Sequence, residues 1–220
     1  ALGSAAYTFG SLETDISGHW SVNTRNAEQH QITQIEMDIP PVPIAKTFLT
    51  NGNKTAYILY NSFTRSTQAL RDSISRLMDE SISNLILDLR MNGGGYANTM
   101  DTVASMLLPG TMEGEVFLKT RYNSFMSQQY LDMYGEDFDK RKFVKTDVRL
   151  GNLQNIYVIT SQRTASASEQ LISGLRPYIN VTTIGARTYG KFTSCLLIND
   201  NVDRGYDPLG IPYKEWCLYL

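Results

Sequence analysis

A short polar segment, Thr164-Ala165-Ser166-Ala167-Ser168-Glu169, has residue types that could carry nucleophilic chemistry. In one interpretation it is a capping box, in which Ser166 and Glu169 satisfy free N–H groups at the start of a helix. In the other, the Ser166 hydroxyl lies where free N–H groups and the positive end of the helix converge, which suits a bound oxyanion. The two interpretations are compatible if Ser168 or Glu169 does the capping.

A second segment, Gly185-Ala-Arg-Thr-Tyr-Gly-Lys191-Phe192, nearly matches the phosphate-binding pattern G-x-x-x-x-G-K-[ST]. Phe192 stands where that pattern requires a hydroxyl for magnesium. Residues 192–198 also have the composition of a strand, whereas a phosphate loop opens a helix. A lysine in a glycine turn is therefore favoured over a nucleotide site, and a flat calorimetric titration with ATP would exclude the nucleotide site.

The third segment is the triplet Gly93-Gly94-Gly95, which does not fit the dinucleotide pattern G-x-G-x-x-G because Asn98 replaces the last glycine. Glycine here could serve a turn that needs positive φ angles. Alternatively, the loop could turn its N–H groups toward an anion or oxyanion. Three consecutive glycines exceed what a turn requires, and this favours the second interpretation.

The elements around these segments follow a strand, loop, helix order. Apolar and β-branched runs predict strands, and apolar residues at helical spacing predict helices, with Ser66 a candidate cap for the first helix. Residues 115–150 predict a strand followed by a surface helix. The glycine triplet joins a strand to a helix as in a βα unit, so the fold class is α/β. The expected strands are 55–60, 85–89, 156–160 and 182–184, and the helices are 70–78, 100–108 and 166–176.

Composition excludes several classes of protein. The 220 residues include 20 Lys+Arg and 22 Asp+Glu, a net charge of −2, which argues against a nucleic-acid or membrane surface driven by bulk charge. Two histidines, His19 and His30, and two cysteines, Cys195 and Cys217, are too few for a His-rich zinc site or a cysteine scaffold. The cysteines could form one disulfide or remain free thiols. No apolar run approaches the roughly 20 residues of a membrane-spanning helix.

A proline-rich stretch, Pro40-Pro41-Val42-Pro43, marks an expected boundary. Residues 1–45 before it form an N-terminal segment rich in Ser, Thr, Gly and Asn, within which 33–39 could be a short strand. Residues 46–220 form the expected catalytic core.

The three segments, in this order and spacing, resemble the C-terminal processing (tail-specific) serine peptidases of family S41. Members carry an Asp-Leu-Arg-x-Asn-x-Gly-Gly element, matched here by residues 88–95, and a Ser-Ala-Ser-Glu element, matched by 166–169. They also carry a Phe/Tyr-Gly-Lys element, matched by 189–191, with the lysine 25 residues after the nucleophile, as Lys191 is after Ser166. The resemblance covers residues 54–198 and is specific because three linked motifs agree.

The resemblance implies a crotonase/ClpP-like spiral of ββα units and a Ser/Lys serine endopeptidase that needs no metal or organic cofactor. It implies protein or peptide substrates, no nucleic-acid partner, no stable membrane insertion and a periplasmic or envelope location. A lysine base must be kept neutral by desolvation, to which Tyr189 and Phe192 could contribute. The implied roles are Ser166 as nucleophile, Lys191 as general base, Ala167 with Gly94 or Gly95 as oxyanion donors, and Asp88 and Arg90 as residues that shape the glycine loop.

Two departures from the family pattern leave alternatives open. Cys195 occupies the position, four residues after the lysine, where members usually have a glutamine that orients the amine, and a thiol is a weak hydrogen-bond partner. Thr193, Ser194 or the backbone could replace it, or the chain could be a non-catalytic relative that binds peptides. Residues 1–45 are too few for the PDZ domain that members often carry, so they are either its last strands or an unrelated segment. The C-terminal portion of the family is also expected to be missing.

Overall fold

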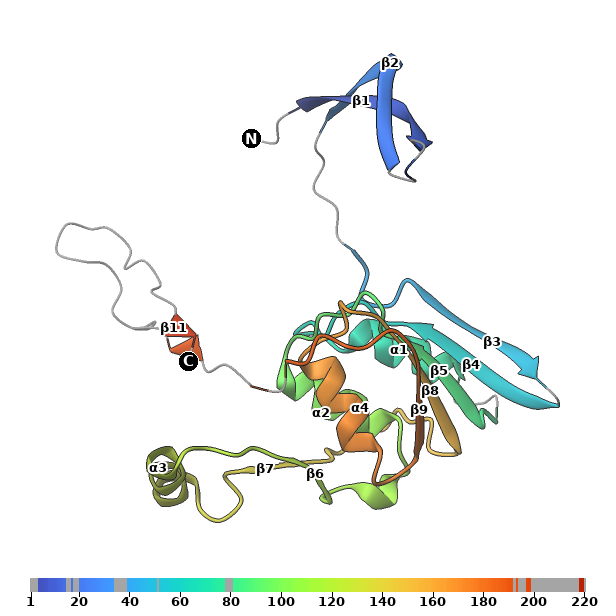
Figure 1. Ribbon diagram of the computed structural model, residues 1–220. Coiled ribbons are helices and arrows are strands. Elements are labelled where there is room, and N and C mark those ends of the chain that lie inside the picture. The colour runs from blue at the N-terminus through green and yellow to red at the C-terminus, as the bar shows by residue number, and fades with distance from the viewer. Residues whose placement is uncertain are drawn as a thin grey trace. The chain divides into compact units, whose positions relative to one another are not determined.

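The computed structural model describes residues 4–14, 17, 20–33, 39–50, 52–77, 81–191, 193, 197–198 and 218–219 (Figure 1). The chain divides into two compact units, residues 1–39 and residues 40–220. In the first unit, β1 (Ser4–Thr14) pairs antiparallel with β2 (Trp20–Thr33), and the register shifts between Phe9 and Ser11. Most of the predicted strand 33–39 lies outside the described residues.

A five-stranded sheet forms the centre of the second unit, in the order β3-β4-β5-β8-β9. Only β3 is antiparallel to its neighbour, and the other three pairings are parallel. Parallel neighbours require crossover connections, which the helices supply. The α/β prediction is therefore confirmed. The strands are β3 (Ile44–Thr50), β4 (Asn53–Leu59), β5 (Asn84–Asp88), β8 (Asn155–Thr160) and β9 (Asn180–Gly185).

Three helices pack against this sheet: α1 (Gln68–Leu77), α2 (Ala97–Met106) and α4 (Ala167–Leu175). The Ser66 hydroxyl accepts a hydrogen bond from Gln68 N–H at the start of α1, as predicted for a cap. Helices α2 and α4 lie side by side (Figure 1). Each fully buried aliphatic side chain of the shared core stabilises the fold by about 1.5–3 kcal/mol. Core residues from strands and helices include Ile58, Leu85, Leu87, Ile156, Val158, Leu70, Ile74, Met100, Val103 and Leu171.

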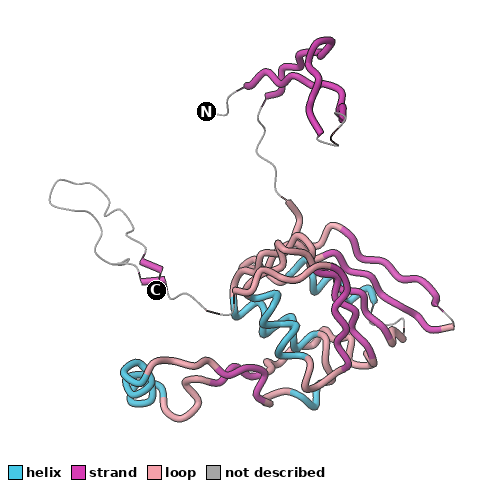
Figure 2. Tube along the Cα trace, in the orientation of Figure 1, coloured by secondary structure: helices cyan, strands magenta, loops and turns pink. Residues whose placement is uncertain are grey.

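Between α2 and β8 the chain forms an arm in which β6 (Val116–Lys119) pairs with β7 (Lys140–Lys142) and carries α3 (Ser124–Tyr134) (Figure 2). The predicted strand and surface helix are thus present, and no residue of α3 is buried. A short 3-10 helix, η2 (Gly110–Met112), precedes the arm. The Arg141 guanidinium binds both carboxylate oxygens of Asp101, at 2.9 and 2.6 Å, and so ties β7 to α2.

Near the end of the chain, β10 (Leu197–Ile198) pairs antiparallel with β11 (Leu218–Tyr219). Cys195 and Cys217 lie outside the described residues, so their pairing stays a prediction. Within the described part of the chain, no helix has the length and apolar character needed to cross a bilayer.

Candidate active site

The three segments singled out in the sequence meet at one edge of the sheet. The glycine loop follows β5, the turn into α4 follows β8, and residues 186–191 follow β9. Carboxyl ends of parallel strands lie at the same edge, where α/β proteins form their sites. Backbone hydrogen bonds join the segments, from Ala165 N–H to the Asn92 carbonyl (3.2 Å) and from Tyr189 N–H to the Thr164 carbonyl (2.9 Å).

Ser166 has an unusual backbone conformation directly before α4, with φ 57° and ψ −118°. A positive φ costs a non-glycine residue about 1–3 kcal/mol, and such residues cluster at active sites. A sharp strand-to-helix turn also exposes the nucleophilic serine of α/β-hydrolases. The sequence predicts a helix start here but gives no sign of this conformation.

Gly94 packs directly against the Ser166 turn. A Cβ atom on Gly94 would lie 2.8 Å from Ser166 Cβ, 2.9 Å from the Ala165 carbonyl oxygen and 3.0 Å from Ala167 N. Its φ of 105° is also a conformation that side chains rarely adopt. Gly95 has φ 142° and lies beside Phe63 in an isolated parallel bridge. Close approach and positive φ therefore both require glycine here.

The N–H groups around Ser166 differ in their availability. Gly94 N–H donates to Asn92 Oδ1 at 2.9 Å and is therefore occupied. Among the described residues, Gly95 N–H has no acceptor. Ala167 N–H belongs to the first residue of α4, so no carbonyl of its own helix can accept it. The sequence left both Gly94 and Gly95 as candidate oxyanion donors. In the part of the chain that the structure describes, only Gly95 of the two has an N–H without an acceptor.

The Glu169 carboxylate connects the Ser166 turn to the segment that carries Lys191. It accepts hydrogen bonds from the N–H groups of Ser166 (2.8 Å), Gly190 (2.6 Å) and Lys191 (2.9 Å). Burial alone would raise the pKa of Glu169. Hydrogen bonds from the Thr188 side chain and from these three N–H groups lower the pKa by more than burial raises it, so the pKa lies below its usual value. The carboxylate therefore remains charged at neutral pH.

The same contacts contradict a phosphate loop. Gly190 N–H and Lys191 N–H, which would cradle a phosphate, donate to the carboxylate of Glu169 instead. Nucleotide binding at this segment is therefore not supported.

Lys191 itself is exposed at the surface. Tyr189, expected to help shield it from water, is 72% exposed, and Phe192 and Cys195 lie outside the described residues. The shielding predicted from Tyr189 is thus wrong for this structure.

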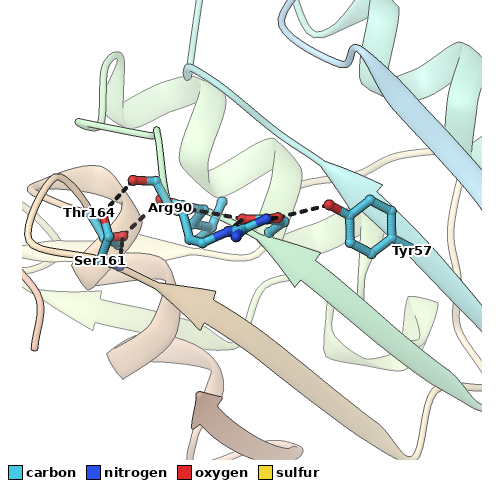
Figure 3. Close-up of polar contacts among 6 residues, drawn as sticks. Tyr57, Arg90, Ser161 and Thr164 are labelled. Atoms are coloured by element: carbon cyan, nitrogen blue, oxygen red, sulfur yellow. Dashed lines mark hydrogen bonds and ion pairs between the residues drawn. The ribbon is translucent and has the colours of Figure 1, made fainter. Parts of the chain in front are cut away.

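Asp88 and Arg90 form a polar network at the end of β5, just before the glycine loop. Figure 3 shows Arg90 between Tyr57 on one side and Ser161 and Thr164 on the other. The fully buried Asp88 carboxylate accepts hydrogen bonds from Arg90 N–H (3.1 Å), Arg90 Nη2 (2.6 Å) and the Tyr57 hydroxyl (2.8 Å). The Ser161 hydroxyl donates to the Arg90 carbonyl, and the Thr164 hydroxyl to the Leu89 carbonyl at 2.8 Å. These bonds join the end of β5 to the turn before Ser166.

Burial raises the pKa of Asp88, but the hydrogen bonds from Arg90 and Tyr57 outweigh it, so the net pKa lies below its usual value. A carboxyl group whose pKa is lower in the folded than in the unfolded protein stabilises the fold at pH values above its unfolded-state pKa. That stabilisation is lost as the pH falls through its folded-state pKa.

Asp88→Asn is expected to lower the free energy of unfolding at pH 7 by about 1–3 kcal/mol, because a buried acceptor for Arg90 is lost. The difference from wild type should shrink at acid pH, where wild-type Asp88 is itself protonated. Urea unfolding at several pH values measures both effects. Asp147→Asn, at an exposed ion pair with Arg71, is the control and should change stability much less. Equal effects of the two substitutions would contradict the argument.

Three buried or half-buried polar residues of the site received no role from the sequence: Asn92, Ser161 and Thr164. Asn92 lies inside the matched motif, and Ser161 and Thr164 precede the serine segment. Position next to a motif was the only available signal, because the carbonyls that these side chains bind, of Tyr60, Arg90 and Leu89, follow other strands.

Comparison with known proteins finds a matching family and several relatives. The sequence profile of peptidase family S41 matches residues 54–199, about two thirds of the chain. The chain belongs to peptidase family S41. The chloroplastic C-terminal processing peptidase of Tetradesmus obliquus is 27% identical over 180 residues, which cover 76% of this chain and 34% of that protein. The carboxyl-terminal-processing protease of Synechocystis sp. is 25% identical over 172 residues, which cover 78% of this chain and 36% of that protein.

Two solved structures have the same fold. A putative S41 protease from Bacteroides fragilis has a TM-score of 0.67 at 21% identity, covering 92% of this chain and 52% of that one. The photosystem II D1 C-terminal processing protease has a TM-score of 0.55 at 23% identity, covering 88% of this chain and 50% of that one. The S41 chain thus spans about a third of these two curated relatives and about half of these two solved structures.

Proposed function

We propose that this S41 chain carries the catalytic centre of a C-terminal processing serine endopeptidase, with Ser166 as nucleophile and Lys191 as general base. The observation that carries the proposal is the conformation of Ser166. It lies at positive φ at the start of α4, with Gly94 packed against it and Ala167 N–H beside it. This arrangement matches what a serine nucleophile and its oxyanion site require.

In the proposed reaction, neutral Lys191 takes the proton of the Ser166 hydroxyl as Oγ attacks the scissile carbonyl carbon. The negative oxygen of the tetrahedral intermediate accepts hydrogen bonds from Ala167 N–H and Gly95 N–H. The Lys191 ammonium then gives its proton to the departing amine, and an acyl-enzyme remains on Ser166. Lys191 next removes a proton from water, which attacks the ester and releases the acid product.

Glu169 supports this mechanism without touching the substrate. One carboxylate binds the backbone on both sides of the proposed dyad, at Ser166 and at Lys191. Its lowered pKa keeps it a hydrogen-bond acceptor at neutral pH, where the reaction would run. The separation of the two backbone segments is thereby fixed, and the Lys191 side chain alone has to adjust.

A lysine base must also lose water, because a solvated amine is protonated at neutral pH. Lys191 is exposed in the free protein. A peptide bound over the site would supply the cover, so substrate binding would complete the dyad. The exposure of Lys191 equally favours the second candidate, a non-catalytic relative that binds peptides at this surface.

Replacing the base separates the two candidates. Lys191→Gln is expected to lower kcat for an unfolded protein substrate by roughly 10²–10⁴-fold, the usual contribution of a general base, with little change in KM. Lys145→Gln, at another exposed lysine, is the matched control and should behave as wild type. Equal turnover by both variants would exclude Lys191 as base, and no turnover by wild type would favour the binding module.

The resemblance and the names of the relatives support the remaining assignments. We take the substrates to be protein tails or peptides, cut near small or apolar residues, and the location to be the periplasm or cell envelope. Two of the relatives are named as carboxyl-terminal or C-terminal processing enzymes, one of them chloroplastic. The crotonase/ClpP-like spiral and the division at residues 45 and 46 stay predictions.

A further inference from the structure

Asn92 lies at the centre of the candidate site, is fully buried and has no part in the proposed chemistry. Its side chain donates from Nδ2 to the Tyr60 carbonyl (3.0 Å) and accepts Gly94 N–H at Oδ1 (2.9 Å). Its backbone carbonyl accepts Ala165 N–H (3.2 Å) and the Ser168 hydroxyl (3.0 Å). Asn92 therefore joins three segments: the end of β4, the glycine loop and the turn that holds Ser166.

The chemistry of the amide explains why asparagine fits this position. One end of the side chain must donate to a carbonyl and the other must accept an N–H, at a fully buried position. An asparagine amide does both, an ionised aspartate only accepts, and alanine does neither. A buried group left without its partner costs free energy, so the loop is held strongly in this one arrangement.

The position of the loop relative to Ser166 leaves little tolerance. The space between Gly94 and the Ser166 turn is too small for a Cβ atom, which would lie 2.8 Å from Ser166 Cβ and 3.0 Å from Ala167 N. Oxyanion donors act only when they lie within hydrogen-bond distance of the oxygen in the transition state. A small shift of the glycine loop would therefore move Gly95 N–H away from the point served by Ala167 N–H.

We infer that Asn92 is a positioning residue for the oxyanion site: its side chain holds Gly94, and its carbonyl holds the Ala165–Ser168 turn, so that Gly95 N–H and Ala167 N–H converge on one point. Asn92 binds Gly94 N–H itself and leaves Gly95 N–H to the substrate. Ser168 is the second tie in the same network. The inference rests on the proposed function and adds to it a residue that acts through the loop, not on the substrate.

The first test compares Asn92→Ala with Asn92→Asp in the full-length protein. Asn92→Ala is expected to lower kcat by roughly 10- to 100-fold, because a misplacement of about 1 Å can cost about 10²-fold. Asn92→Asp keeps an acceptor for Gly94 N–H and should retain more of kcat than Asn92→Ala. Ser73→Ala, which removes a buried hydroxyl on α1, is the control and should leave kcat unchanged.

A purely structural role would lower substrate affinity and kcat together, so binding is measured separately. In a Ser166→Ala background, Asn92→Ala should leave peptide affinity unchanged. In the protein that keeps Ser166, Asn92→Ala should lower the affinity for a peptidyl boronate, which imitates the tetrahedral intermediate, in parallel with kcat/KM. If Asn92→Ala does not fold, Ser168→Ala is measured in its place and should give a smaller loss confined to kcat. A kcat equal to wild type, or a loss seen only in peptide affinity, would overturn the inference.

A measurement that does not depend on peptidase activity distinguishes this inference from the proposed function. Hydrogen exchange of Gly94 N–H, followed by NMR, should accelerate in Asn92→Ala while exchange in the core of β5 stays slow. Unchanged exchange at Gly94 would overturn the inference whether or not the protein is a peptidase. Absence of any hydrolysis that depends on Ser166, with faster exchange at Gly94, would instead overturn the proposed function and leave the positioning contact established.

Discussion

Ser166→Ala is expected to reduce hydrolysis of an unfolded protein by roughly 10⁴-fold or more, because removal of a serine nucleophile leaves only the contribution of the oxyanion site and of binding. The fold should be unaffected. Alanine adopts the same backbone conformations as serine, and the substitution keeps the hydrogen bond from Ser166 N–H to Glu169 while it removes the side-chain half of the capping box.

The measurement is the appearance of new peptide termini, followed by mass spectrometry, together with the thermal unfolding midpoint of each variant. Ser75→Ala, at an exposed serine on α1, is the matched control and should retain full turnover. Ser166→Ala should still bind peptide, which makes it a trap for natural substrates. Turnover equal to wild type in Ser166→Ala would contradict the proposed role of the serine.

Gly94→Ala is expected to have the second-largest effect, a loss in kcat of roughly 10²–10³-fold, similar to removal of an oxyanion donor. The added Cβ would lie 2.8–3.0 Å from atoms of Ser166, Ala165 and Ala167. Two of these atoms belong to the backbone and cannot rotate away, so the loop itself has to move. The positive φ of Gly94 adds strain to the same substitution.

Gly93→Ala provides a closely matched control. Its Cβ would meet only the Arg163 carbonyl oxygen, at 3.9 Å, an ordinary contact. Substitution one residue away should therefore leave kcat near wild type. Assays at a temperature well below both unfolding midpoints separate lost catalysis from lost stability. Equal activity of Gly93→Ala and Gly94→Ala would contradict the close packing of the loop on Ser166.

Much of the secondary structure followed from residue pattern. The strands expected at 85–89 and 156–160 are β5 (Asn84–Asp88) and β8 (Asn155–Thr160), and the helix expected at 166–176 is α4 (Ala167–Leu175). These elements are short and strongly apolar on their buried positions, so burial and local preference favour the same structure. The capping box expected from Ser166 and Glu169 was also confirmed, because the Ser166 side chain meets the Glu169 N–H and the Glu169 carboxylate accepts Ser166 N–H.

The candidate site was less predictable. Spacing alone gave no means of choosing between Gly94 and Gly95, and the choice depends on Asn92, whose amide takes up Gly94 N–H. The reach of Glu169 to Gly190 and Lys191 was not foreseen either, since a capping role accounted for its position. The expected shielding of Lys191 by Tyr189 failed because neighbours in sequence need not cover each other in space.

The sequence by itself determined which segments carry the chemistry, which elements precede and follow them, and the family to which the motifs belong. Only the tertiary structure decided how the segments meet, because parallel pairing of β5, β8 and β9 places loops distant in sequence at one edge. It also decided the strained conformation of Ser166, the occupied and unoccupied N–H groups beside it, and the carboxylate that joins Ser166 to Lys191. Local contacts such as Gly94 N–H to Asn92 contribute, but the bonds that bring the segments together join residues 21 to 76 positions apart, which local preference does not specify.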